Sequence, residues 1–254
     1  MNTTLTAVLV SACLLAAVWI GMWLRRFLPA AHLSPDSKDT VKLAMGLVAT
    51  MSALLLGLLV NSAKSSFDTR RGQVIQMASK FALLDRMLGI YGPEAAEVRR
   101  ESRTLVEELM RRIWPGEVTL PAQLKSDAPT GDAFYVAIQG LSPRDDAQRA
   151  LKAQAVALAV EVAQHRSLML AQSTTSLSTP MLIMVVWWLL VIFLGFSLIA
   201  PSNATANLAL LVSALCAAGA IFLILELDRP FGGLIQISSE PMRNALSQLG
   251  KWGL

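Results

Sequence analysis

Small and polar residues recur at every third or fourth position within an otherwise leucine-rich stretch, and this stripe is the first candidate for chemistry. At about 100° per residue, the following residues share one face of a helix: Gly46, Thr50, Ala53, Gly57, Asn61 and Lys64. In a ring of subunits such a face would line a pore, with Lys64 at its mouth attracting anions. Small residues at this spacing also allow two helices to approach closely in lipid. The stripe therefore predicts either a pore lining or a helix-packing seam.

A second candidate is the segment "LELDRPFGG", where two carboxylates interrupt a long apolar run. Its notable residues are Glu226, Asp228, Arg229, Pro230, Phe231, Gly232 and Gly233. Pro230 should end a helix, and the two glycines after Phe231 permit a tight turn. Arg229 can neutralise one of the acids. We expect a structural turn first, and an ion-facing role for the acids second.

Other chemistries have little support in the sequence. Nucleophile-elbow, zinc-protease and phosphate-loop motifs are absent, so we expect no enzyme. His32 and His165 are isolated, and Cys13 and Cys216 lie within apolar segments, where small packing residues are a better explanation than a disulfide or metal site. We therefore expect neither a metal nor a cofactor. The mild net charge of +4 implies no nucleic-acid partner.

The elements that must position these residues are membrane-spanning helices. The chain is 54% hydrophobic and 16% charged, against roughly 25% charged residues in a typical soluble domain. A bilayer core takes about 20 helical residues to cross, and the segments 5–24, 41–60, 181–200 and 207–225 are long enough. Their charged residues lie at the ends, apart from Lys42 just inside the second segment. We expect an all-α integral membrane protein with four transmembrane helices.

The region between the second and third spans is predicted to be helical and to lie outside the membrane. Residues 61–90 contain no proline, so the second span should continue as a helix to about residue 90. A further helix should start with Ser142 as its cap. The expected domains are residues 1–60 with the first two spans, 61–180 as a cytoplasmic helical bundle, 181–225 with the last two spans, and 226–254 as a turn and short helix.

Basic residues near the span ends place the 61–180 region and both termini in the cytoplasm. Arg25 and Arg26, directly after the first span, favour the opposite orientation. The expected location is a bacterial inner membrane.

Three segments resemble one family, the bacterial bestrophin-like membrane proteins with four spans and unknown function. They are "FDTRRGQVIQMASKFALLDR" (67–86), "HRSLMLAQSTTSLSTPM" (165–181) and the C-terminal "LELDRPFGGLIQISSEPMRNAL" (225–246), with its core LDxPFxG. The chain departs from the family where Met77 precedes Ala78, because the family typically has a glutamate there. True bestrophins are pentameric anion channels with four spans and long cytosolic helices, and their layout is similar to this one.

Two functions follow from these features. The resemblance and the stripe together predict a homo-oligomeric ion channel for small anions such as chloride. The alternative is a non-conducting membrane scaffold or sensor whose helical cytoplasmic region binds a partner. The expected partners in the first case are the lipid bilayer, further copies of the chain, and the anion.

Overall fold

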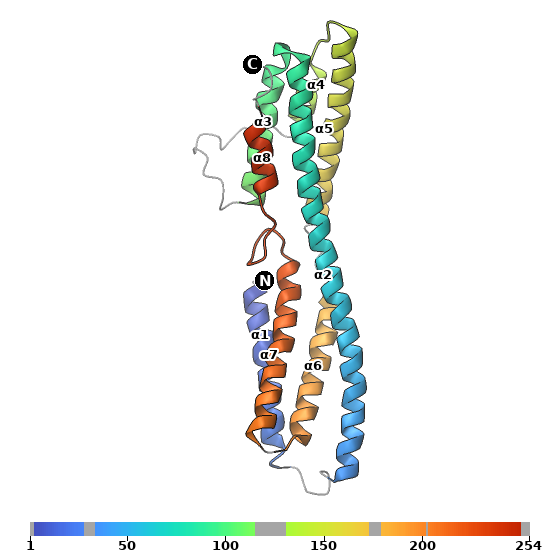
Figure 1. Cartoon of the computed structure of the whole chain (residues 1–254), viewed down its shortest axis with the longest axis vertical. Helices are drawn as coiled ribbons and strands as arrows, with labels where there is room; N and C mark the ends of the chain where they lie inside the picture. Colours follow the sequence, from blue (N-terminus) through green and yellow to red (C-terminus); the bar gives the residue numbers. More distant parts are fainter. Residues whose placement is uncertain (1–2, 28–33, 115–130, 173–178, 202, 250–254) are drawn as a thin grey trace. The chain divides into compact units, whose positions relative to one another are not determined.

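The computed structural model describes residues 3–27, 34–114, 131–172, 179–201 and 203–249, and these residues form helices joined by turns (Figure 1). The helices are α1 (Thr3–Leu24), α2 (Pro35–Tyr91), α3 (Ala96–Ile113), α4 (Gly131–Gln139), α5 (Asp146–Gln172), α6 (Thr179–Ile199), α7 (Ala204–Leu227) and α8 (Glu240–Gln248), with a short 3-10 turn at Pro93–Ala95. The predicted all-α fold is confirmed. The segment 114–132, with three prolines and two glycines, is predicted from sequence to be a loop, and its residues 115–130 lie outside the described residues.

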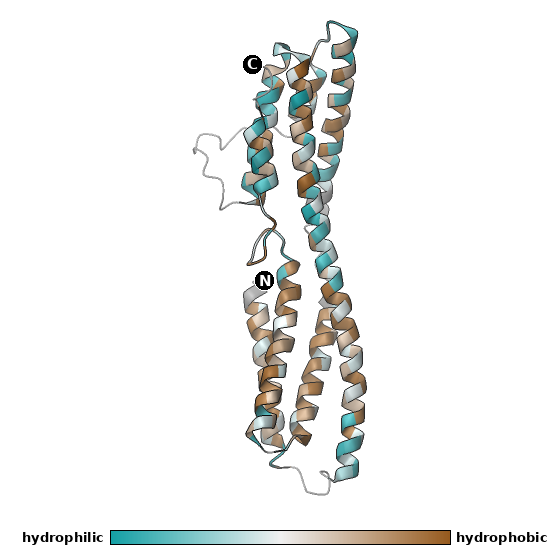
Figure 2. Ribbon diagram, in the orientation of Figure 1, coloured by the Kyte–Doolittle hydropathy of each residue, from teal (hydrophilic) through white to brown (hydrophobic). Residues whose placement is uncertain are grey.

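The chain divides into two compact units. The first, here called the span unit, comprises residues 1–67 and 176–235; the second, the helical unit, comprises residues 68–175 and 236–254. Figure 2 shows that apolar residues dominate the helices of the span unit, whereas apolar and polar residues alternate in the helical unit. By length and composition, four helices are able to cross a membrane: α1, α2, α6 and α7. The predicted spans 5–24, 41–60 and 207–225 lie within α1, α2 and α7, and the span 181–200 extends one residue past the end of α6.

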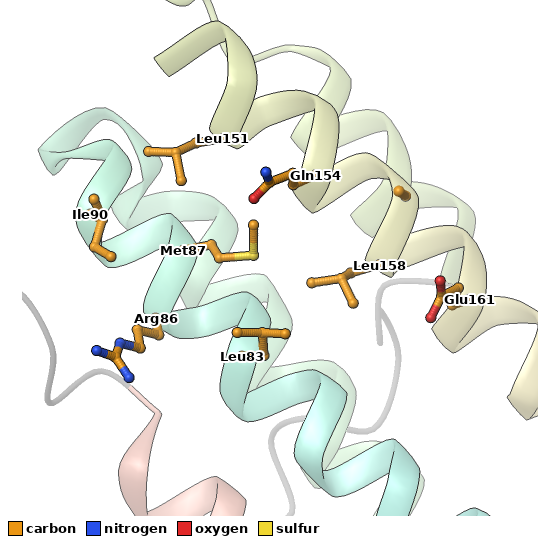
Figure 3. A pocket seen from close by; sticks show the side chains of 9 residues that line it. Leu83, Arg86, Met87, Ile90, Leu151, Gln154, Leu158 and Glu161 are labelled. Carbon is orange, nitrogen blue, oxygen red and sulfur yellow. The ribbon is translucent and has the colours of Figure 1, made fainter. Parts of the chain in front are cut away.

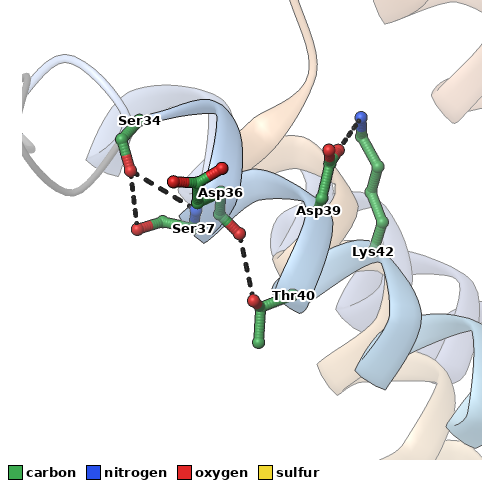
Figure 4. A network of polar contacts seen from close by, with 6 residues as sticks. All are labelled: Ser34, Asp36, Ser37, Asp39, Thr40 and Lys42. Atoms are coloured by element: carbon green, nitrogen blue, oxygen red, sulfur yellow. Dashed lines mark hydrogen bonds and ion pairs between the residues drawn. The ribbon is translucent and has the colours of Figure 1, made fainter.

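Helix α2 begins at Pro35, earlier than the predicted second span at residue 41 (Figure 4). Ser34 caps the helix, because its hydroxyl accepts a hydrogen bond from the backbone N–H of Ser37 at 3.3 Å. Asp36 lies in the first turn, where a negative charge complements the helix dipole. The exposed pair Asp39–Lys42, 2.9 Å apart, lies one turn further on. In sequence these charged residues suggest a loop, but they lie in the first two turns of a helix, where they are exposed.

In the span unit α1 packs against both α6 and α7. The Arg25 guanidinium, just past α1, donates to the carbonyl oxygen of Ala200, just past α6. These two helices therefore end at the same level and run in the same direction. Asn203 caps α7, because its side-chain oxygen accepts from the backbone N–H of Ala206 at 2.8 Å, and α7 returns antiparallel. Helix α2 contacts α6 where the Met45 side chain covers Gly195.

Several hydroxyl groups in the apolar helices are satisfied within their own helix. Each donates to the carbonyl oxygen four residues earlier: Ser11 to Ala7, Thr50 to Gly46, Ser52 to Val48 and Ser197 to Phe193. Such bonds remove the cost of placing a hydroxyl in an apolar medium. These serines and threonines therefore need no partner from a neighbouring helix.

Helix α1 approaches α6 closely at Gly21. A Cβ atom there would lie 2.8 Å from Ser197 Cβ and 2.9 Å from the carbonyl oxygen of Leu194. We expect Gly21→Val to lower the free energy of unfolding by about 1–3 kcal/mol, because overpacking forces the helices apart. Denaturant unfolding in detergent micelles, followed by circular dichroism, measures the change.

The matched control is Gly219→Val in α7, where an added Cβ meets no atom within 4 Å. It should leave stability within about 0.5 kcal/mol of the parent. Equal losses at both positions would contradict the close α1–α6 contact.

In the helical unit a buried ion pair joins α2 to α3. Arg99 donates to both carboxylate oxygens of Asp85, at 2.9 and 3.2 Å, and the Asp85 side chain is only 1% exposed. The indole N–H of Trp114, directly after α3, donates to the carbonyl oxygen of Ile237 at 2.8 Å in a buried contact. This bond ties the segment before α8 to the end of α3.

The predicted start of α5 at Ser142 is wrong, because the helix begins at Asp146. Asp145 caps it by accepting from the backbone N–H of Gln148 at 2.7 Å. The Gln148 side chain in turn donates to the carbonyl oxygen of Tyr91 at 2.8 Å. The residues before Asp146 therefore form a connection held to the end of α2 rather than a first helical turn.

Candidate functional site

The small-polar stripe lies on the outer surface of α2 in the single chain. Each of its residues is exposed: Gly46, Thr50, Ala53, Gly57, Asn61 and Lys64. A Cβ atom added at Gly46 or Gly57 would meet nothing within 4 Å. The residues of α2 that are buried in the span unit are Ser52, Leu59, Ala63 and Phe67, about 130° around the helix from the stripe at 100° per residue. The stripe therefore faces away from the other helices of the span unit.

The polar groups of the stripe differ in what they can offer a ligand. The Thr50 hydroxyl already donates to the carbonyl oxygen of Gly46 at 2.9 Å, so it can offer a ligand only the lone pairs of its oxygen. The Lys64 ammonium lies 5.8 Å from the centroid of the Phe67 ring, within range of a cation–π interaction. Asn61 carries an exposed amide one turn before Lys64. Cationic and amide groups together suit a small anion.

The outer face of α2 also carries large apolar side chains beside the stripe. Leu43, Leu47, Leu54 and Leu58 are each at least 60% exposed. Cys13 and Cys216, expected as packing residues, are free thiols on the exposed faces of α1 and α7. In the described residues no group of three histidine, cysteine or acidic side chains is arranged to hold a metal ion.

The signature at the end of α7 forms a tight turn around a buried carboxylate. Glu226 is 1% exposed, and its Oε1 atom accepts a hydrogen bond from the backbone N–H of Leu234. Gly233 has φ of 150°, and a Cβ atom there would lie 2.9 Å from the Glu226 carboxyl carbon. Only glycine fits both the dihedral angle and the space.

The other signature residues complete this turn. Pro230 is buried, and Asp228, Arg229 and Phe231 are half-buried. The backbone N–H of Gly232 donates to the carbonyl oxygen of Arg229 at 3.3 Å. Glu226 thus contacts the chain after α7 and is enclosed in the single chain. The signature and the stripe both belong to the span unit. The Glu226 side chain of the signature is buried, whereas the residues of the stripe are exposed.

Two polar clusters of the helical unit were not singled out from sequence. One is the Asp85–Arg99 ion pair. The other joins Lys80 of α2 to Glu161 and His165 of α5, with Lys80 Nζ 2.8 Å from Glu161 Oε2 and 2.7 Å from His165 Nε2. The hydrogen bond from Lys80, and then its charge, lowers the pKa of Glu161 below the usual value. Lys80 and His165 are 85 positions apart, so no local pattern pairs them.

An open apolar groove of about 530 Å³ runs between α2 and α5 in the helical unit (Figure 3). Its lining residues are Leu83, Arg86, Met87, Ile90, Leu151, Gln154, Ala157, Leu158 and Glu161. The side chains of Leu83, Met87 and Leu158 point into the space between the two helices. The groove lies one to two turns along α2 from Lys80.

These features define a class: a helical membrane protein with four apolar helices and a helical extension, whose small-polar face is exposed in the single chain. Residues 12–242 match the family model of the Bestrophin-like domain. The chain therefore belongs to the Bestrophin-like family, as its C-terminal signature and helix layout suggested. None of the curated proteins matches it.

Solved structures with the same fold come from a bacterial bestrophin homologue of Klebsiella pneumoniae. One structure of that protein matches with a TM-score of 0.68 and 15% identity, over 99% of this chain and 98% of the other. A point variant of it matches with a TM-score of 0.73 and 14% identity, over 99% and 98% of the two chains. A second variant matches with a TM-score of 0.68 and 15% identity, over 99% of both. The likeness establishes a bestrophin fold along almost the whole chain.

Proposed function

We propose that the protein is the subunit of a homo-oligomeric membrane channel that conducts small anions such as chloride. The observation that carries the proposal is the outward-facing stripe on α2. Asn61 and Lys64 directly follow the span expected over residues 41–60, and a polar or charged side chain is disfavoured where it faces lipid. A ring of copies that turned this face inward would remove Asn61 and Lys64 from lipid. Membership of the Bestrophin-like family supports the same assignment.

The geometry favours an anion over a cation. Between residues 46 and 64 the charged residue of this face is Lys64, and Asn61 presents amide donors beside it; Asp68 follows on the same face one turn further on. We place the protein in a bacterial inner membrane with both termini and the helical unit in the cytoplasm. Lys64 would then lie near the cytoplasmic mouth of the conducting path and concentrate anions there.

A specific observation favours the second candidate, a non-conducting scaffold or sensor. The open groove between α2 and α5 offers apolar surface to a binding partner in the helical unit. In that case the stripe is only a packing seam between copies. Gly57→Leu should then disrupt assembly, and no preparation should conduct.

The channel is tested by chloride flux from liposomes that contain the purified protein, after light scattering has shown an oligomer. At an effective dielectric constant of 20, one charge 5 Å from an anion changes its energy by about 3 kcal/mol. Reversing the charge with Lys64→Glu should therefore reduce chloride flux about tenfold or more, since 1.4 kcal/mol is already a factor of ten.

The control is Ser66→Glu, which adds a negative charge at nearly the same level of α2 but on another face; Ser66 is also exposed. It should leave flux within about twofold of the parent if the stripe lines the path. Absence of flux in a folded, oligomeric preparation would reject the channel. Equal losses in both variants would reject the stripe as its lining.

A further inference from the structure

The cluster of Lys80, Glu161 and His165 joins the two long helices of the helical unit. Lys80 projects from α2 and is 22% exposed, and it reaches both Glu161 and His165 on α5. Glu161 and His165 are separated by four positions, so they are neighbours on one helix face. One lysine therefore bridges the helices through two acceptors.

The Lys80–His165 contact fixes the protonation state of the imidazole. An ammonium group has three donors and no acceptor, so His165 Nε2 must accept and carry no proton. The proton of the neutral ring is then on Nδ1. That atom is buried and has no hydrogen-bond partner among the described residues. The contact as observed requires a neutral histidine.

Protonation of the ring would reverse this interaction. Both nitrogens of a charged imidazole are donors, and two cations would then meet at hydrogen-bond distance. The charged groups that face His165 are Lys80 from α2 and Glu161 from α5, and Arg166 follows it in the chain. Lys80 lowers the pKa of Glu161 below the usual value of a glutamate, so Glu161 is ionised at pH 5 and above. A carboxylate four positions before a cation is also the favourable order in a helix.

We propose that Lys80, Glu161 and His165 form a pH-sensitive joint between α2 and α5. With His165 neutral, Lys80 holds the two helices together. With His165 protonated, the imidazolium repels Lys80 and pairs with Glu161 in its own helix, so one of the two contacts that Lys80 makes with α5 is lost. Histidine is the side chain whose unperturbed charge change falls between pH 5 and 8, so the tests below span that interval. The joint requires no ion flux and is independent of the channel proposal.

The tautomer is tested first. The chain contains two histidines, so nitrogen-15 spectra of the imidazoles in detergent micelles contain two ring systems, and His32→Gln assigns them. At pH 8 His165 should be the Nδ1–H tautomer. The Nε2–H tautomer at pH 8, or a ring that stays neutral down to pH 5, would overturn the joint.

The opening of the joint is tested by the distance between spin labels on the two helices. Labels are placed at Gln76→Cys on α2 and Gln164→Cys on α5, both exposed, with Cys13 and Cys216 replaced by alanine. Between pH 8 and pH 5.5 the distance distribution should lengthen and broaden. His165→Gln should abolish this response, because its amide oxygen accepts from Lys80 and does not titrate. His32→Gln should retain it.

Circular dichroism at both pH values separates local opening from acid unfolding. Helicity should stay constant in all variants. A distance that is independent of pH in the parent would overturn the proposal. So would an equal response in His165→Gln, since the titrating group would then lie elsewhere.

Discussion

Arg99→Ala is expected to lower the free energy of unfolding of the protein by about 3–5 kcal/mol. The change removes the guanidinium that makes two hydrogen bonds to Asp85, and the Asp85 side chain is only 1% exposed. Removing one partner of a buried ion pair is costly because the remaining buried charge loses a partner that offset its desolvation. Denaturant unfolding in mild detergent, followed by circular dichroism, measures the loss.

The adjacent residue supplies a matched control. Arg100 is 71% exposed, and its ion pair with Glu97 at 2.7 Å lies on the surface of the same helix. Arg100→Ala should cost less than about 1 kcal/mol, as exposed pairs do. The double variant Asp85→Leu/Arg99→Met should recover most of the loss, because apolar pairs of similar volume often replace buried ion pairs without penalty. A small effect of Arg99→Ala would mean that Asp85 is not held by this pair.

Gly233→Ala should destabilise the end of α7 by about 2–5 kcal/mol. A side chain at φ of 150° costs about 1–3 kcal/mol. The new Cβ would also displace the Glu226 carboxylate from the backbone N–H of Leu234. A hydrogen bond to a charged group is worth about 1.5–3 kcal/mol. Unfolding experiments and hydrogen exchange at the Leu234 amide measure the two effects.

Gly232→Ala is the matched control for this turn. Gly232 does not have a positive φ, and an added Cβ would meet nothing within 4 Å. It should leave both the stability and the exchange rate of the Leu234 amide nearly unchanged. Equal effects of the two substitutions would show that the turn requires flexibility in general and not the conformation of Gly233.

The four spans were predictable because an apolar medium excludes charge, and that requirement leaves a pattern in local sequence. The early start of α2 was missed because Asp36, Asp39 and Lys42 resemble a loop, although Ser34 caps a helix there. The start of α5 was misplaced because a good capping sequence at Ser142 competes with a connection to the end of α2. A capping motif is a local pattern, so it does not indicate whether a contact with a distant residue, such as that of Gln148 with Tyr91, will be preferred.

The candidate site was likewise predictable only in part. Helical periodicity indicated that the stripe occupies one face of α2, but it could not tell which neighbours that face has. The role of Gly233 was partly predictable, because glycines after a proline suggest a turn; its contact with Glu226 was not. The cluster around Lys80 was invisible in sequence, since its partners are brought together by the packing of α2 on α5.

The hydroxyls of Ser11, Thr50, Ser52 and Ser197 bear on how the protein is made. Each hydroxyl bonds within its own helix, so none of them needs a hydrogen-bond partner from a later segment of the chain in order to enter lipid. Each span can therefore leave the translocon as a finished helix, in the order of synthesis. The pairing of α1 with α6, far apart in the chain, includes the close fit at Gly21 and the bond from Arg25 to Ala200, and it can occur after the last span has been inserted.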